Sequence, residues 1–172
     1  MKNTKIICLV CIILAVMFCL VGCGDNSYNA KNAKSVDITA TLIHADGVLL
    51  QKIESKFTKS GKTYNFVTKT TSLNALDSGK ADMYSTEEQS GANAKFAVPS
   101  FVDTDFVAIF EKTETKLYGK ITAEKIATLG IADATSDVLV ELQLNKTNIV
   151  SLSVSYTNAK GATVSIVAKM TY

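Results

Sequence analysis

Residues 138–172, VLVELQLNKTNIVSLSVSYTNAKGATVSIVAKMTY, decide the fold because apolar and polar residues alternate through three successive runs. A period of two is that of a β-strand with one buried face. The two connections, 145–148 and 158–161, are short and consist mostly of turn-forming residues. The segment therefore predicts an antiparallel meander with one face in water. The expected inward residues are Val138, Val140, Leu142, Leu144, Val150, Leu152, Val154, Tyr156, Val164, Ile166, Ala168, Met170 and Tyr172.

A second, less regular meander is predicted over residues 36–73. Turn residues at 45–47 and 60–62 separate three runs that are rich in Thr, Val, Tyr and Phe, which favour half-buried strands. Its expected inward residues are Val36, Ile38, Ala40, Leu42, Leu49, Ile53, Phe57, Tyr64 and Phe66. The charged side chains between them indicate a solvated face, with a patch for an anionic ligand as the alternative. They are Lys52, Glu54, Lys56, Lys59, Lys62 and Lys69.

The segment between the meanders, residues 74–116, has the weakest periodicity. Strands are expected near 80–88 and 95–99, and residues 100–110 suit either a helical face or a buried strand. A short helix is predicted from Thr122, which can cap it, to Gly130, which can end it. The fold class that follows is mainly β (α+β): an antiparallel sheet of two meanders with one or two short helices, for which a half-barrel is one form. It occupies a single domain over residues 35–172.

The N-terminus indicates export. Lys2 and Lys5 precede sixteen consecutive apolar residues, 6–21, which form a secretory signal and are few for a membrane span. The residues Leu20-Val21-Gly22-Cys23 resemble the lipobox of bacterial lipoproteins, in which the chain is cut before the cysteine and the thiol is diacylated. The resemblance implies a signal peptide over residues 1–22 and lipid attachment at Cys23. Two acyl chains, at about 0.8 kcal/mol per buried methylene, would hold the protein on the extracytoplasmic face of the cell membrane.

Residues 23–34 are polar, rich in Asn and Lys, and without an apolar period, so a flexible tether is expected there. The other three cysteines, Cys8, Cys11 and Cys19, lie within the signal. The exported domain therefore has no cysteine for an internal disulfide. Its stability depends on its core, which a body of about 140 residues can supply.

The charge pattern excludes nucleic acid as the partner. All 18 basic residues are lysine, and the 16 that follow the signal are balanced by 16 acids. A neutral body without arginine lacks both the positive field that binds phosphates and the bidentate side chains that read guanine. The predicted partner is the membrane, through diacylated Cys23, and the sequence names no protein partner.

The sequence indicates no enzyme, catalytic residue, metal site or cofactor. His44 is the one histidine and is expected in a turn. The sequence has no motif for a serine or cysteine nucleophile that this histidine could activate. Asp103 and Asp105 lack the glycine and distal glutamate of a calcium loop and are expected at a helix start, while Glu87-Glu88 is expected to be solvated. No glycine-rich nucleotide motif occurs. A hydrolase, the remaining enzyme class, would need acids clustered around His44.

The aromatic residues have two interpretations. Either they fill the core, or some of them line an apolar ligand cavity between the sheet and the middle segment. The candidates for ligand contact are Phe57, Phe66, Phe101, Phe106 and Phe110.

The order of features along the chain also resembles a known family. An export signal with a lipobox, a long antiparallel sheet, and the run LYGKI (117–121) leading through a short helix to three closing strands are similar to the half-barrel lipid-carrying lipoproteins of the Lol and mycobacterial LppX type. The resemblance covers about residues 117–172 and implies a lipid carrier. We therefore expect a membrane-anchored, non-enzymatic binding or carrier module for a hydrophobic or envelope ligand. A surface protein-interaction or structural module without a small-molecule ligand is the alternative.

Overall fold

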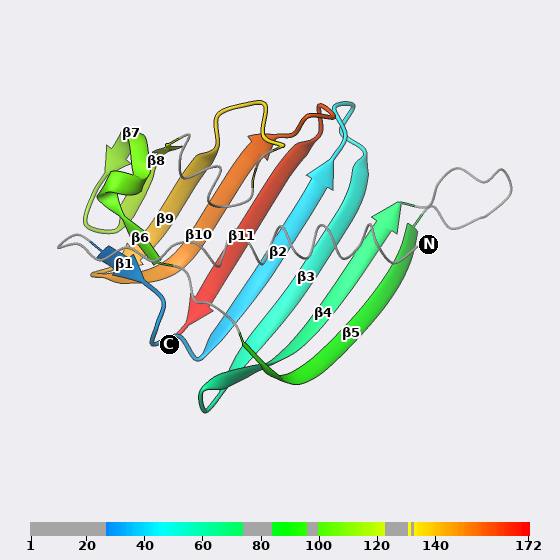
Figure 1. Ribbon diagram of the computed structural model, residues 1–172, viewed down its shortest axis with the longest axis horizontal. Helices are drawn as coiled ribbons and strands as arrows, with labels where there is room; N and C mark the ends of the chain where they lie inside the picture. Colours follow the sequence, from blue (N-terminus) through cyan, green and yellow to red (C-terminus); the bar gives the residue numbers. More distant parts are fainter. Residues whose placement is uncertain (1–26, 74–83, 96–99, 123–130, 132) are drawn as a thin grey trace, which may run out of the picture.

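The computed structural model describes residues 27–73, 84–95, 100–122, 131 and 133–172. These residues form one sheet, whose main path runs in the order β5-β4-β3-β2-β11-β10-β9-β8-β7 (Figure 1). The strands are β1 (Ser27–Asn29), β2 (Ser35–Ile43), β3 (Leu49–Ser60), β4 (Thr63–Leu73), β5 (Tyr84–Ala94), β6 (Ser100–Val102), β7 (Phe106–Lys112), β8 (Lys116–Ile121), β9 (Leu139–Asn145), β10 (Asn148–Thr157) and β11 (Thr163–Thr171). A 3-10 turn, η1 (Asp103–Asp105), links β6 to β7.

Two antiparallel meanders make up the sheet, which confirms the predicted mainly β class. The first runs from β2 to β5 and the second from β7 to β11, and they join where β2 pairs with β11. Ile166 of β11 lies opposite Ala40 of β2 on one side and Val154 of β10 on the other. The C-terminal strand pairs with β10 as predicted, but it lies in the middle of the sheet. Because β5 and β7 stand at opposite ends of the path, the sheet of the described residues is open, like a half-barrel.

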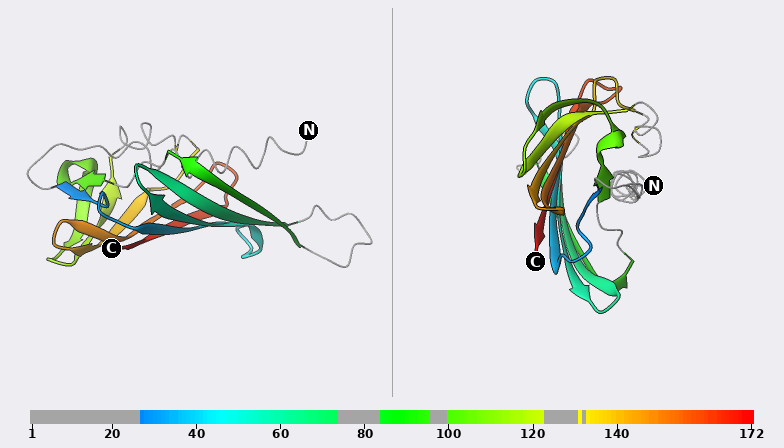
Figure 2. Two further views of the ribbon diagram at one scale, coloured as in Figure 1. Left: turned by 90° about the horizontal axis from the view of Figure 1, so that it is seen from below. Right: turned by 90° about the vertical axis from the view of Figure 1, so that its left-hand side faces the viewer.

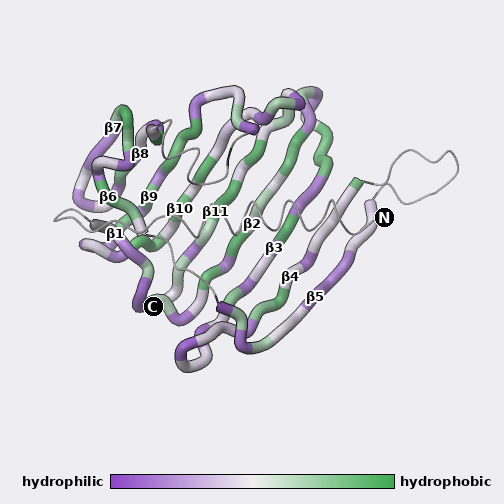
Figure 3. Tube along the Cα trace, viewed as in Figure 1, coloured by the Kyte–Doolittle hydropathy of each residue, from purple (hydrophilic) through white to green (hydrophobic). Residues whose placement is uncertain are grey.

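The alternation of the sequence separates two faces of this sheet. We call the face that carries the apolar positions the inner face. Figure 3 shows that the hydrophobic positions are concentrated on β9, β10, β11 and β2, and that β5 is mostly polar. The buried inner side chains come from both meanders, as the sequence predicts. They include Val36, Ile38, Ala40, Ile53, Phe57, Leu117, Val140, Leu142, Leu152, Val154, Ile166 and Ala168.

The inner face changes character toward the β5 end. On β3 and β4, Gln51 donates to the Ser72 hydroxyl at 3.1 Å, and the hydroxyls of Ser55 and Thr68 lie 2.9 Å apart. On β5 the inner positions are polar and exposed, Glu87 among them. The apolar core therefore ends at β3 and β4, and the face continues as a band of hydroxyl and amide groups.

The predicted tether is wrong for residues 27–34. These residues form β1 and a turn, and Ala30 and Ala33 are fully buried in the core. β1 pairs with β6 and touches β10 at Asn148, and both short strands lie against the inner face at one corner of the sheet (Figure 2). Two small apolar side chains and a three-residue strand are enough to fix the segment, although neither leaves a periodic pattern in the sequence.

The four predicted turns are confirmed. Gly47, Gly61 and Gly161 have φ of 88°, 62° and 74°, the left-handed region that glycine enters without strain. In the β10–β11 turn the Asn158 side-chain oxygen accepts from the backbone N–H groups of Lys160 and Ala162, both at 3.0 Å. Each connection joins neighbouring antiparallel strands.

Two inward positions of the second meander are wrong. A bulge between Ile149 and Ser151 shifts the register of β10, so Ile149 is buried and Val150 is exposed. Tyr172 follows the end of β11 and is 37% exposed, with its hydroxyl donating to the Ile149 carbonyl oxygen at 2.7 Å. The alternation itself is correct, but a one-residue insertion cannot be read from it.

The middle segment is strand where the sequence left helix and strand open. Residues 100–110 divide into β6, η1 and most of β7. The strand expected near 80–88 is β5, which ends at Ala94, six residues later than expected. Lys95 lies outside any strand, and residues 96–99 of the second expected strand are outside the described residues. The predicted helix also falls outside the described residues, apart from Thr122 at its start. Among the described residues η1 is the one helical element.

Candidate functional site

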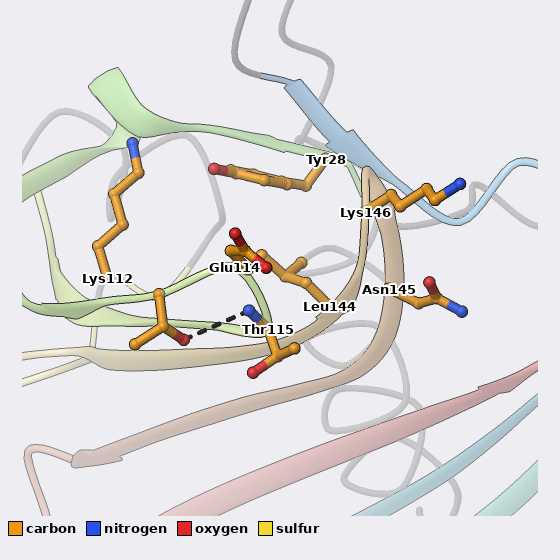
Figure 4. Close-up of a pocket in the computed structure, with 8 residues that line it drawn as sticks. Tyr28, Lys112, Glu114, Thr115, Leu144, Asn145 and Lys146 are labelled. Carbon is orange, nitrogen blue, oxygen red and sulfur yellow. Dashed lines mark hydrogen bonds between the residues drawn. The ribbon is translucent and has the colours of Figure 1, made fainter.

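An open pocket of about 990 Å³ lies at the corner of the sheet where β1 meets two hairpin turns (Figure 4). Its volume is that of a small-molecule site. The ring of Tyr28 and the side chain of Leu144 supply its apolar surface, and hydroxyl, carboxylate, amide and ammonium groups surround them. The lining residues are Tyr28, Lys112, Thr113, Glu114, Thr115, Leu144, Asn145 and Lys146.

Backbone hydrogen bonds hold the three parts of this corner together. In the β7–β8 turn, Thr113 N–H donates to the Lys116 carbonyl at 2.8 Å, and Leu144 N–H of β9 donates to the Thr115 carbonyl at 2.8 Å. Asn29 N–H of β1 donates to the Thr147 carbonyl in the β9–β10 turn at 2.9 Å. The pocket is therefore lined by groups on paired strands and tight turns, which position side chains more precisely than free loops do.

A charged cluster lies behind the Tyr28 ring. Lys112 at the end of β7 forms an ion pair with Asp103 of η1, and this hydrogen bond is the main cause that raises the pKa of Lys112. Partial burial raises the pKa of the Tyr28 phenol, and the negative charge of Asp103 raises it further. The second oxygen of Asp103 is buried and has no hydrogen-bond partner among the described residues. The cluster neutralises Lys112, which lines the pocket, whereas Asp103 does not line it.

The pocket suits a molecule with an apolar part and a polar head. Figure 4 shows the Tyr28 ring lying across from Leu144, with Glu114 beside them, while Asn145 and Lys146 point outward from their turn. Lys146 is exposed and has φ 57°, so the turn itself directs it to solvent. Sequence analysis missed all of these residues, because they come from β1 and two turns that only the pairing of distant strands brings together.

The five phenylalanines predicted to contact a ligand do not form one group. Phe57 and Phe66 make one pair on β3 and β4, with ring centroids 6.0 Å apart, and Phe101 and Phe106 make another at the β6–β7 corner, 5.3 Å apart. Both pairs belong to the inner core or pack against it. Phe110 lies apart from them, 55% exposed, with its ring 5.3 Å from that of Tyr118.

Among the polar residues singled out in the sequence, His44, Asp103 and Asp105 lie in turns. His44 is confirmed in the β2–β3 turn, with its Nδ1 2.9 Å from Asp46, and both side chains are exposed. Asp103 and Asp105 are confirmed in the first turn of a helical element, the three-residue η1, where the Asp105 carboxylate accepts from Val102 N–H at 3.1 Å. Within the described ranges, no three His, Cys, Asp or Glu side chains lie close enough together to hold a metal ion. In the same ranges no helix is long and apolar enough to cross a membrane.

No protein-family model matches the chain, and no curated protein matches it. Among solved structures, a redesigned β-barrel is 11% identical over 77% of this chain and 87% of its own, with a TM-score of 0.22.

Proposed function

We propose that this protein is a membrane-anchored extracytoplasmic lipoprotein that acts as a non-enzymatic binding or carrier module for a hydrophobic or envelope ligand. The anchor is a diacylated Cys23, and the ligand is an amphiphile that enters the pocket beside β1. The observation that carries the proposal is the position of this pocket. Its Tyr28 side belongs to a strand that begins at Ser27, four residues after the cysteine of the lipobox.

The pocket chemistry supports an amphiphile over a fully polar ligand. An acyl or other apolar group gains about 25 cal/mol per Å² that it buries against Tyr28 and Leu144. The hydroxyls of Thr113 and Thr115 and the carboxylate of Glu114 then remain for the head group. The polar band on the inner face of β3 to β5 offers a second surface of mixed character next to the apolar core.

The proposal assigns no catalysis. His44, the one histidine of the chain, forms its contact with Asp46 in an exposed turn, and the pocket lies at the other end of the strands. A general base should lie within hydrogen-bond reach of the proton that it removes, so His44 does not serve a ligand in the pocket.

Lipid analysis of the purified protein tests the proposal. We expect protein from an acylating bacterial host to yield, on organic extraction, a non-covalent amphiphile in about equal amount to the chain. Thr115→Trp should fill the pocket and lose this amphiphile, while Ala45→Trp, in the exposed β2–β3 turn, should keep it. Wild-type protein that yields no amphiphile, or two variants that retain it equally, would remove the pocket as the ligand site.

One observation favours the alternative, a surface module that binds protein. β7 is an edge strand, and its Val107, Ile109 and Phe110 are 60%, 42% and 55% exposed. An edge with free backbone groups and apolar side chains can add a strand from a partner. Cross-linking in envelope extracts separates the two functions: a specific protein cross-linked through β7, together with no extracted amphiphile, would favour the alternative.

A further inference from the structure

We infer that the edge of the sheet next to β1 is a docking surface for an anionic lipid bilayer, so that the domain stands on the membrane with its strands running away from it. The inference rests on the proposed anchor at Cys23. It adds an orientation and a lipid class, and it places the mouth of the pocket beside the membrane surface.

Exposed lysines gather at this edge, which lies along the bottom of Figure 1. Hydrogen bonds trace it from one side to the other: Asn29 to Thr147, Lys34 to Thr171, and Lys59 to Lys34. At its far end the Thr63 hydroxyl lies 3.3 Å from the side-chain oxygen of Asn93, just before Lys95. We call this surface the lysine edge, and its exposed lysines are Lys31, Lys34, Lys59, Lys62, Lys95 and Lys146.

The charge of the lysine edge is not neutralised locally. None of its six lysines forms an ion pair with a described residue. Lys112 and Lys116, which flank the β7–β8 turn on the same side, are each paired with an acid, as are Lys52 and Lys120 further away. Glu114 is the exposed acid of the β7–β8 turn on the same side. The charged side chains without an ion-pair partner at this edge are therefore mostly positive.

The opposite edge has the other sign. It consists of the β2–β3 turn, the β10–β11 turn and the segment before β9. Thr135 N–H donates to the Thr157 carbonyl at 2.8 Å, which joins the last two, and the pairing of Ile43 with Thr163 places the first beside them. Its acids are Asp46, Asp133 and Asp137, of which Asp137 is paired with Lys120, and Lys160 is the exposed lysine of its turns. A chain that is neutral after its signal is therefore polarised along its strands.

The chain length fixes which end meets the membrane. Ser27 is the fourth residue after Cys23, and four residues of fully extended chain span at most about 14 Å. β1 lies at the lysine edge, so lipidation brings this edge and not the acidic one to the head groups. Each lysine near an anionic surface gains about 1 kcal/mol, which corresponds to about a fivefold preference per lysine. Six of them make docking the dominant orientation.

Lysine acetylation in vesicles tests the orientation. The full chain is reconstituted into vesicles of 30% phosphatidylglycerol in phosphatidylcholine or of phosphatidylcholine alone, and mass spectrometry reads the modification rate of each lysine. In the anionic vesicles we expect the lysine edge to react at least about tenfold more slowly, and high salt should remove the protection. Lys69 and Lys160, which lie away from this edge, should react equally in both. Equal rates at the lysine edge, or protection of Lys160, would overturn the inference.

A matched pair of variants makes the test independent of folding and of the pocket. The variant K34Q/K62Q/K95Q neutralises three edge lysines that lie outside the pocket, and K52Q/K69Q/K160Q neutralises three lysines away from this edge. The first should abolish most of the protection at Lys31 and Lys59, and the second should preserve it.

Failure of the anchor can be told apart from failure of docking. An uncleaved chain without an acyl group can still partition into the vesicle through its apolar segment 6–21, and lysine rates read on the vesicle-bound fraction then report orientation in either case. Intact mass reads the acyl group separately. Protected edge lysines on a chain without an acyl group would contradict the proposed lipid anchor and support the docking surface. An acylated chain whose edge lysines are not protected would support the anchor and contradict the docking surface.

Discussion

Ile166 tests the register of the sheet at the scale of one residue. It is 2% exposed and packs on the inner face between Val154 and Ala40, so Ile166→Asp would bury a carboxylate without a partner. We expect a loss of at least about 4 kcal/mol from a total of about 5–15 kcal/mol. Urea unfolding at pH 7 measures it.

The neighbouring residue is the control for this prediction. Ser165 points to the outer face between Ser155 and Thr41, and Ser165→Asp should change stability by less than about 0.5 kcal/mol. Equal urea midpoints for the two variants would mean that the two faces of β11 have been exchanged.

Tyr156 gives the fold a dependence on alkaline pH. Its side chain is 4% exposed, and burial, followed by the nearby charge of Asp133, raises the pKa of its phenol well above 10. The folded protein therefore keeps this proton after the unfolded chain has lost it. The stabilisation is complete below about pH 10 and decreases at higher pH by about 1.4 kcal/mol per pH unit.

Replacement of the phenol should make the dependence shallower. We expect Tyr156→Phe to lose less stability between pH 9 and pH 11 than the wild type, as measured by urea midpoints at both values. The slope should not vanish, because the pKa values of Tyr28, Tyr64 and Tyr172 are also raised by burial. Tyr84→Phe, at the exposed edge of the sheet, should keep the wild-type slope; a shallower slope in this control would remove Tyr156 as the cause.

At the scale of the element, the two ends of the sheet differ. β5 ends it with exposed polar side chains, which discourage pairing with another sheet. β7 ends it with three exposed apolar side chains on a strand whose outer backbone side has no neighbour on the sheet path. Self-association is therefore expected through β7.

The edge variant Ile109→Lys should weaken this association. A charge on an edge strand opposes pairing with a second copy, so the sedimentation coefficient should fall toward that of the monomer at high protein concentration. Val67→Lys is the matched control, because Val67 is 46% exposed on the outward side of the interior strand β4. If both variants associate as the wild type does, β7 is not the contact.

At the scale of the whole molecule, the proposed lipid anchor makes Cys23 a determinant of where the protein resides, and we expect the residue to have no part in how the chain folds. The residue precedes the first described strand, so Cys23→Ser should leave the urea midpoint unchanged. It should remove the acyl mass and the partition of the processed chain into detergent. Intact mass in the same experiment identifies any uncleaved chain, which would partition through its apolar segment.

The equivalent change inside the signal is the control. Cys19→Ser alters a cysteine of the apolar run and should leave both acylation and partition intact. Loss of partition in both variants would show that export, and not lipidation, has been disrupted.

The sequence by itself determined the strands that carry a clear local signal. Alternation set the inward face of β9 to β11, and glycine with φ above zero set the turns at Gly47, Gly61 and Gly161. These features depend on neighbours in the chain, so residue types alone predict them. The bulge after Ile149 was not predicted, because one inserted residue leaves the composition of the strand unchanged.

Tertiary structure alone decided the rest. The contact between β2 and β11 joins residues more than a hundred positions apart, and β1 and β6 are three-residue strands, too short to show a period. The pocket and the lysine edge both arise where these distant segments meet. Each is fixed by which backbone groups find partners across the sheet, a property of the assembled fold that no window of sequence contains.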